Sequence, residues 1–309
     1  MQQANGRRLY IQEVCTRDGF QIEKRFVATD EKVRLVNGLS GTGVAVIEVT
    51  SFASPKAIPM LADAEEVLRR IDRVDGVDYA ALVPNVRGCE RALSANVDVI
   101  NIVMSASESH NRANLRMSCS DSLSQFARIA ELARGHATVN ASVSTAFGCP
   151  FEGEVSLTRV LEIVERLTLM HLGRITLCDT TGMANPAQVL SVFNATKHRW
   201  PEVTFAAHFH DTRSMGMANA LAALEAGIDR FDASLGGLGG CPFAPGASGN
   251  VCTEDLVHML SAMGYDTHVD LQALLTLAQR LPSIVQHEVP GQLIKAGPST
   301  RRYPLPPDD

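Results

Sequence analysis

The residues best suited to metal chemistry are two histidines, His208 and His210, which follow the apolar run 203–207. Side chains two positions apart on a β-strand point to the same face, so one strand end can offer two imidazoles to one cation. A metal needs more than two protein ligands, and the rest of the chain must supply the others. For an isolated pair, the alternative is that both imidazoles are satisfied in the core or by Asp211.

The elements that would position this pair alternate regularly along the chain. We expect strands at 9–14, 45–49, 79–83, 97–104, 137–144, 174–178, 203–207 and 230–234. Between and after them we expect helices at 29–40, 64–73, 87–94, 120–134, 157–170, 186–198, 215–226 and 254–263. Strands separated by helices imply a parallel sheet, and eight such units at this length predict a TIM (β/α)8 barrel. The alternative is a doubly wound open sheet, but no GxGxxG turn follows the first strand.

The sequence predicts one catalytic α/β domain over residues 1–309. The barrel should span about residues 8–265, with a C-terminal helical extension at 271–281 and an irregular Pro- and Gly-rich tail after Pro290. No linker or second domain is expected.

Composition narrows the class of protein. The chain is 45% hydrophobic and 20% charged with a net charge of −6, so it lacks the basic excess of nucleic-acid binders. No apolar run reaches the roughly 18 residues of a membrane span, and the N-terminus has no signal-peptide pattern. We therefore expect a cytoplasmic protein with no nucleic-acid or membrane partner. Its seven cysteines form no CxxC pair, which predicts reduced, mostly buried thiols.

Polar residues gather at the predicted carboxyl ends of the strands, where TIM barrels place their active sites. The side chains among them that can bind a metal or take part in catalysis are Arg17, Asp18, Glu48, Asp179, His208 and His210. Asp18 with the two histidines makes a two-histidine, one-carboxylate set, which suits a divalent metal with open positions. An added amide oxygen, such as that of Asn250, would favour Mn²⁺ or Mg²⁺.

The other charged residues each have two interpretations. Arg17 can hold an oxyanion that develops beside the metal, or it can form a structural ion pair with Asp18 or Glu48. Asp179 and Glu48 are candidates for a general base and its orienting partner. Either carboxylate can equally cap a helix or orient a histidine ligand.

The segment 236–250 contains six glycines and two prolines and is long for a strand-to-helix loop. It has no GK[ST] sequence, so it is not a Walker loop. Such a loop wraps a ligand or closes as a lid. Gly239, Gly240 and Cys241 lie at its centre, and the thiol is a candidate proton donor; the alternative is an incidental thiol on a surface loop.

These residues resemble the 3-hydroxy-3-methylglutaryl-CoA lyase family of the DRE-TIM metallolyases from about residue 10 to 274. The shared motifs are RDG at 17–19, FGCP at 147–150, HFHDT at 208–212, and GLGGCP at 237–242 with GASGN at 246–250. The glycine-and-cysteine loop is highly specific, whereas the HxHD motif alone indicates only the wider superfamily.

The resemblance implies retro-aldol cleavage of 3-hydroxy-3-methylglutaryl-CoA to acetyl-CoA and acetoacetate. It implies that Mg²⁺ or Mn²⁺ is bound by Asp18, His208, His210 and Asn250. Arg17 would stabilise the enolate, and Cys241 would take part in proton transfer to it. Glu48 and Asp179 would assist removal of the hydroxyl proton. The implied catalytic set is Arg17, Glu48, Asp179, His208 and Cys241.

Departures from the family pattern bear on the substrate. The family carries an arginine and a tyrosine on the fifth strand, where this chain has Asn140 and Ser142. The acyl pocket should be larger and more neutral, so citramalyl-CoA or another 3-hydroxyacyl-CoA is an alternative substrate. Gln21, Lys56 and Arg87 are expected substrate contacts, the cations through CoA phosphates. Each cation can equally be a solvated surface charge.

Two other functions are alternatives to the lyase. A Claisen-type acyl-CoA:2-oxoacid synthase generally has additional C-terminal domains, and a non-catalytic acyl-CoA-binding barrel would not need every catalytic position filled. The oligomeric state is open, with a homodimer or a higher homo-oligomer as the expectation.

Overall fold

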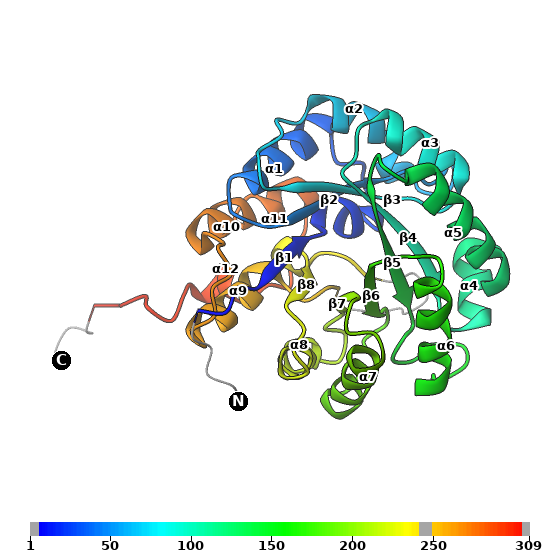
Figure 1. Cartoon of the computed structure of the whole chain (residues 1–309). Coiled ribbons are helices and arrows are strands. Elements are labelled where there is room, and N and C mark those ends of the chain that lie inside the picture. The colour runs from blue at the N-terminus through cyan, green and yellow to red at the C-terminus, as the bar shows by residue number, and fades with distance from the viewer. Residues whose placement is uncertain (1–5, 241–248, 305–309) are drawn as a thin grey trace.

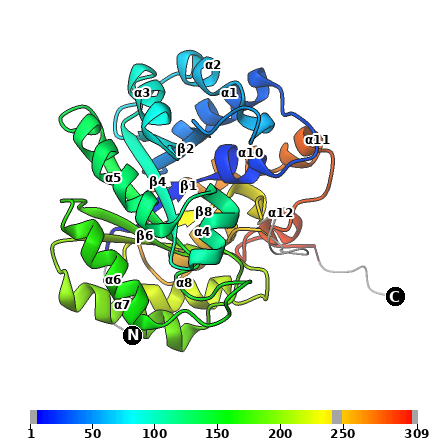
Figure 2. The same ribbon diagram turned by 90° about the vertical axis from the view of Figure 1, so that its right-hand side faces the viewer.

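The predicted TIM barrel is confirmed in a computed structural model, which describes residues 6–240 and 249–304. Eight parallel strands close into a barrel in chain order, and helices surround it (Figure 1). The strands are β1 Tyr10–Glu13, β2 Val46–Ser51, β3 Asp78–Leu82, β4 Val99–Ser105, β5 Thr138–Ser144, β6 Arg174–Asp179, β7 Thr204–Phe209 and β8 Arg230–Ala233. Because β1 pairs with both β2 and β8, the first and last units of the chain are neighbours (Figure 2).

Five of the nine helices that surround the barrel in the described part of the chain begin after a residue whose side chain caps them. The nine are α1 Thr29–Ser40, α2 Ala64–Arg70, α3 Val86–Ser94, α4 Glu108–Leu115, α5 Cys119–Ala133, α6 Leu157–Thr168, α7 Pro186–Arg199, α8 Gly216–Glu225 and α9 Thr253–Ala262. The capped helices are α3 to α7, and the side chains that accept a backbone N–H at their starts are Asn85, Ser107, Ser118, Ser156 and Asn185. The short polar helix α4 was not expected.

The C-terminal extension differs from the expectation in two details. The single helix expected over 271–281 is two helices, α10 Leu271–Ala278 and α11 Leu281–Val285. Pro282 lies in the first turn of α11, where its missing N–H is tolerated. In the interior of one continuous helix the same proline would break the hydrogen-bond pattern, so the segment forms two helices. The tail expected to be irregular contains α12 Leu293–Ala296, whose first turn is held by the Asp255 carboxylate.

Two other expectations concern membrane spans and thiols. Within the described ranges, none of the helices combines the length and apolar character needed to cross a membrane. The described cysteines are all buried, and none of them forms a disulfide with another described residue.

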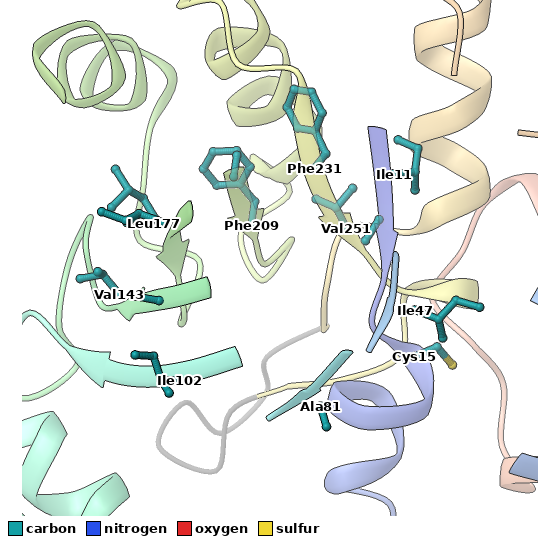
Figure 3. Close-up of a cluster of buried hydrophobic side chains, with 14 of the residues drawn as sticks. Ile11, Cys15, Ile47, Ala81, Ile102, Val143, Leu177, Phe209, Phe231 and Val251 are labelled. Atoms are coloured by element: carbon teal, nitrogen blue, oxygen red, sulfur yellow. The ribbon is translucent and has the colours of Figure 1, made fainter. Parts of the chain in front are cut away.

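Strand alternation gives the barrel an apolar outer face and a polar interior. One buried side chain from each strand points outward under the helices (Figure 3): Ile11, Ile47, Ala81, Ile102, Val143, Leu177, Phe209 and Phe231. Burial of each larger side chain contributes roughly 1.5–3 kcal/mol. Inside, a small apolar cluster of Val46, Ala80 and Val99 lies near the amino-terminal end.

The barrel interior above this apolar cluster is polar. Its side chains include Gln12, Glu48, Asn101, Asn140, Thr176 and Asp232. TIM barrels usually fill this space with branched apolar residues. Buried polar groups must be hydrogen-bonded to be tolerated. A polar layer in place of the usual apolar one therefore indicates that these side chains serve the site at the barrel mouth rather than packing alone.

Candidate active site and metal centre

A tight turn directly after β1 brings two of the predicted site residues into the barrel mouth. The π-helical turn η1, Cys15–Gly19, carries Arg17 and Asp18, both buried. Glu13 at the end of β1 braces this turn, because its carboxylate accepts hydrogen bonds from the Cys15 N–H at 2.8 Å and the Leu235 N–H at 3.0 Å. Burial raises the pKa of Glu13 to about 7 despite these bonds. Single π-turns are rare and often mark functional sites.

The candidate metal ligands converge at this mouth. The Nε2 atoms of His208 and His210 lie 3.2 Å apart, and His210 Nε2 lies 3.9 Å from Asp18 Oδ2. One ligand atom from each of the three side chains lies within 4.8 Å of the others. All three residues are buried. Three donor atoms so close together can share one ion, as the sequence predicted.

A residue that the sequence analysis did not name orients His208. The Nδ1 atom of His208 lies 3.1 Å from Asp232 Oδ2 on β8, which leaves Nε2 free to face Asp18. Carboxylates commonly hold metal-binding histidines in this way. Burial alone would lower the pKa of His208, but the hydrogen bond and charge of Asp232 outweigh it and raise that pKa.

The other two candidate ligands have the protonation state that a metal would require. Burial and the neighbouring His208 lower the pKa of His210 to about 4, so its imidazole is neutral near pH 7. Burial alone would raise the pKa of Asp18, but Arg17 and the two histidines hold it at about 2. Asp18 is therefore anionic, as a metal ligand would have to be.

Asn250 stands beside this set as the fourth predicted ligand. Its Nδ2 donates to Asp18 Oδ2 at 2.8 Å and to the Leu238 carbonyl at 2.9 Å. Its buried Oδ1 has no hydrogen-bond partner among the residues that the structure describes. A half-turn of the amide would exchange the two atoms and turn the oxygen toward the side of Asp18. An unpartnered buried amide oxygen beside one carboxylate and two imidazoles fits a divalent ion.

Glycines allow the loop to approach Asn250 this closely. A Cβ atom on Gly239, whose φ is +122°, would lie 2.2 Å from Asn250 Nδ2. Gly249, with φ +96°, would place a Cβ 2.4 Å from the Gly237 carbonyl oxygen. Gly240 is also described and buried, whereas Cys241 lies outside the described residues.

Both ion-pair partners expected for Arg17 are present at once. Its Nε and Nη2 atoms each lie 2.5 Å from Glu48 Oε2, and Nη1 donates to Asp18 Oδ1. Burial alone would lower the pKa of Arg17, but the charges of Asp18 and Glu48 raise it. Burial raises the pKa of Glu48, although Arg17 and a hydrogen bond from Asn101 oppose this. The guanidinium is a fixed positive charge beside the candidate metal ligands.

Asp179 ends β6 and is completely buried. Its Oδ1 accepts the Met183 N–H at 2.7 Å, while Oδ2 has no partner within the described part of the chain. Burial raises the pKa of Asp179 to about 6, although backbone N–H groups oppose the rise. One oxygen therefore holds the following turn, and the other makes no hydrogen bond to the residues that the structure describes.

The remaining predicted residues are those expected to contact the substrate. Asn140 and Ser142 point into the barrel, where they hydrogen-bond to Asn101. Gln21 lies just beyond η1 and is half-buried. Lys56 and Arg87 are exposed on segments that follow β2 and β3.

Comparison with known proteins agrees with this site. The model of the HMGL-like family matches residues 8–281. The chain belongs to the HMGL-like family. The hydroxymethylglutaryl-CoA lyase of Bacillus subtilis is 47% identical over 88% of this chain and 92% of its own length. The (R)-citramalyl-CoA lyase of Chloroflexus aurantiacus is 40% identical over 93% of this chain and 94% of its own.

A solved HMGL-like structure also matches nearly the whole fold. An HMG-CoA lyase from Acinetobacter baumannii, in complex with coenzyme A and 3-methylmalate, superposes with a TM-score of 0.93 and 49% sequence identity. The match covers 96% of this chain and 98% of that one. The family resemblance drawn from the sequence motifs is therefore confirmed.

Proposed function

We propose that this chain is a metal-dependent carbon–carbon lyase that cleaves 3-hydroxy-3-methylglutaryl-CoA to acetyl-CoA and acetoacetate. The convergence of Asp18, His208 and His210 beside the fixed charge of Arg17 carries this proposal. The likeness to the Bacillus subtilis lyase supports it. We further propose that residues 1–309 act as one catalytic domain, in the cytoplasm and as a homo-oligomer.

Asp18, His208, His210 and Asn250 would hold Mg²⁺ or Mn²⁺. The ion, when bound, lowers the pKa of the tertiary hydroxyl of the substrate. Asp232 keeps the His208 ring in the tautomer that leaves Nε2 unprotonated.

The protein groups then divide the proton and charge movements. Asp179 accepts the hydroxyl proton through Oδ2. The O–H electrons form the ketone as the C2–C3 bond breaks, and that bonding pair moves into the thioester as an enolate. Arg17 stabilises the enolate oxygen, because Glu48 and Asp18 hold its guanidinium in place before the charge develops. Protonation of C2, which we assign to Cys241, completes acetyl-CoA.

Citramalyl-CoA is the second candidate substrate, with pyruvate as its keto product. The neutral side chains Asn140 and Ser142 on β5 favour it, since no cation is present at these positions to select the longer carboxylate tail of the glutaryl group. The likeness to the Chloroflexus aurantiacus lyase supports it as well.

A coupled cleavage assay tests both candidates. The enzyme is supplied with Mg²⁺ or Mn²⁺ and with 3-hydroxy-3-methylglutaryl-CoA or either citramalyl-CoA enantiomer. Acetoacetate with acetyl-CoA supports the first substrate, and pyruvate selects the second. Absence of cleavage for all of them, with metal bound, would refute the proposed lyase.

A further inference from the structure

We propose that Asn101 on β4 is a positioning residue that holds Glu48, and through Glu48 the guanidinium of Arg17. The polar side chains of β5 act through the same amide. This inference rests on the proposed function, in which Arg17 stabilises the enolate.

The hydrogen bond from Asn101 completes the shell of Glu48. Asn101 Nδ2 donates to Glu48 Oε1 at 2.7 Å, while Arg17 occupies Oε2 through two N–H groups. Both carboxylate oxygens are thus engaged on opposite sides. A buried carboxylate held on one side alone can rotate about its last torsion, whereas donors on both sides fix its plane and that of the guanidinium.

Two side chains of β5 fix the orientation of the Asn101 amide. Ser142 Oγ donates to Asn101 Oδ1 at 2.8 Å, and Asn140 Nδ2 donates to the same atom at 2.9 Å. The amide oxygen is occupied by two donors, so its nitrogen must face Glu48. The inter-strand register brings this about, because Asn101 pairs directly with Asn140.

The chain of contacts runs unbroken from β5 to the metal ligands. Ser142 and Asn140 bind Asn101, Asn101 binds Glu48, Glu48 binds Arg17, and Arg17 binds Asp18. Asn101 is 8% exposed and Glu48 is 4% exposed, so water cannot readily replace a missing donor. Ser142 and Asn140 therefore influence the rate constant of cleavage, and not only the fit of the acyl chain.

Steady-state kinetics of Asn101→Leu and Asn101→Asp test the inference. Leucine removes both functions of the amide, while aspartate keeps the acceptor for Ser142 and Asn140 but loses the donor. We expect kcat to fall about 10- to 150-fold in both, the range for loss of a hydrogen bond to a charged group, with KM within about threefold. The acid limb of the kcat profile should move to higher pH, because Glu48 loses a donor that favours its ionised form.

Asn111→Leu is the matched control. The Asn111 amide is fully buried and makes three hydrogen bonds, to Ser105, Met117 and Ser122, none of which touches Glu48. It should lower the melting temperature without moving the pH profile. A kcat within twofold of the unaltered enzyme in both Asn101 variants, or a raised KM with unchanged kcat, overturns the inference.

Ser142→Ala tests the β5 end of the chain of contacts. It removes one of two donors to Asn101, so kcat should fall about two- to fivefold equally for each acyl-CoA that the enzyme cleaves. A change in the ratio of kcat/KM between substrates, with kcat retained, would assign Ser142 to substrate contact and overturn its role through Asn101.

Crystal structures separate this inference from the proposed function. In Asn101→Leu, and in Asn101→Asp if the first fails to fold, the side chains of Glu48 and Arg17 should shift. Asp18 and His208 should keep their places, and Mn²⁺ affinity should stay within about threefold. If the unaltered enzyme cleaves no acyl-CoA, the proposed lyase activity is refuted, but the crystal structures still test the role of Asn101. Unchanged positions of Glu48 and Arg17 in the variants would overturn that positioning role.

Discussion

The substitution Asp232→Asn tests how far the metal centre depends on the partner of His208. The carboxylate accepts from two donors at once, His208 Nδ1 through Oδ2 and Gln12 Nε2 through Oδ1. An amide has one acceptor oxygen, so one of these donors must face an NH2 group. If that donor is His208, the ring is driven to the tautomer with the proton on Nε2, which cannot bind a metal.

The size of the effect follows from the contact that is lost. A hydrogen bond to a charged group contributes about 1.5–3 kcal/mol, which corresponds to roughly 10- to 150-fold in affinity. Loss of the carboxylate partner of a metal-binding histidine typically costs 10- to 100-fold, in agreement. We therefore expect the Kd for Mn²⁺ of Asp232→Asn to rise about 10- to 100-fold.

Titration calorimetry of Mn²⁺ binding measures this change, with circular dichroism as a check of the fold. Gln12→Leu is the matched control, because it removes the other hydrogen-bond partner of Asp232 and leaves the contact to His208 intact. Its Kd should stay within about threefold of the unaltered protein. Equal weakening in the two variants, or none in Asp232→Asn, would refute the role assigned to the carboxylate.

Three further predictions concern neighbouring residues. Arg17→Met should lower kcat by about 100- to 1,000-fold with little change in KM, because the charge acts in the transition state; steady-state kinetics measures this, and a normal kcat contradicts it. Burial raises the pKa of Asp179 from 3.8 to about 6, so the folded protein binds the Asp179 proton more tightly than the unfolded chain does. The stabilisation from this proton is complete below the unfolded-state pKa of 3.8 and is lost as the pH rises through the folded-state pKa of about 6. Urea unfolding between about pH 4 and 7 should show this decline, and Asp179→Asn should flatten it. Gly239→Ala should abolish Mn²⁺ binding in calorimetry, since its Cβ would lie 2.2 Å from Asn250 Nδ2, while the far-UV circular dichroism spectrum stays unchanged. Unchanged Mn²⁺ binding would mean that the loop relaxes to accommodate the methyl group and would contradict the prediction.

The barrel was predictable because its signal is local and repeated. Each strand is a short apolar run, and each helix follows a turn, so the pattern of eight units survives errors of a few residues at the boundaries. The turn η1 and the helix α4 were missed because neither has apolar periodicity. Polar residues at strand ends were predictable for the same reason that the strands were.

Partners inside the barrel were not predictable from strand ends. Asp232 reaches His208, and Asn140 reaches Asn101, because each pair is in direct register across two strands. Register is set by how the whole barrel packs, and one sequence does not state it. An inward-facing Asp within the run 230–234 was the available signal, since a charge inside a barrel needs a partner.

The proposed metal ligands lie on both sides of the junction where the barrel closes. Asp18 follows β1, the histidines lie on and just after β7, and Asn250 follows β8, 232 positions from Asp18. A bound ion would link the first and last units of the barrel, which meet only when the barrel is closed. At a free metal concentration a hundredfold above Kd, this binding adds about 2.7 kcal/mol to the free energy of unfolding. Metal-dependent melting would then report on closure of the ring as well as on the chemistry inside it.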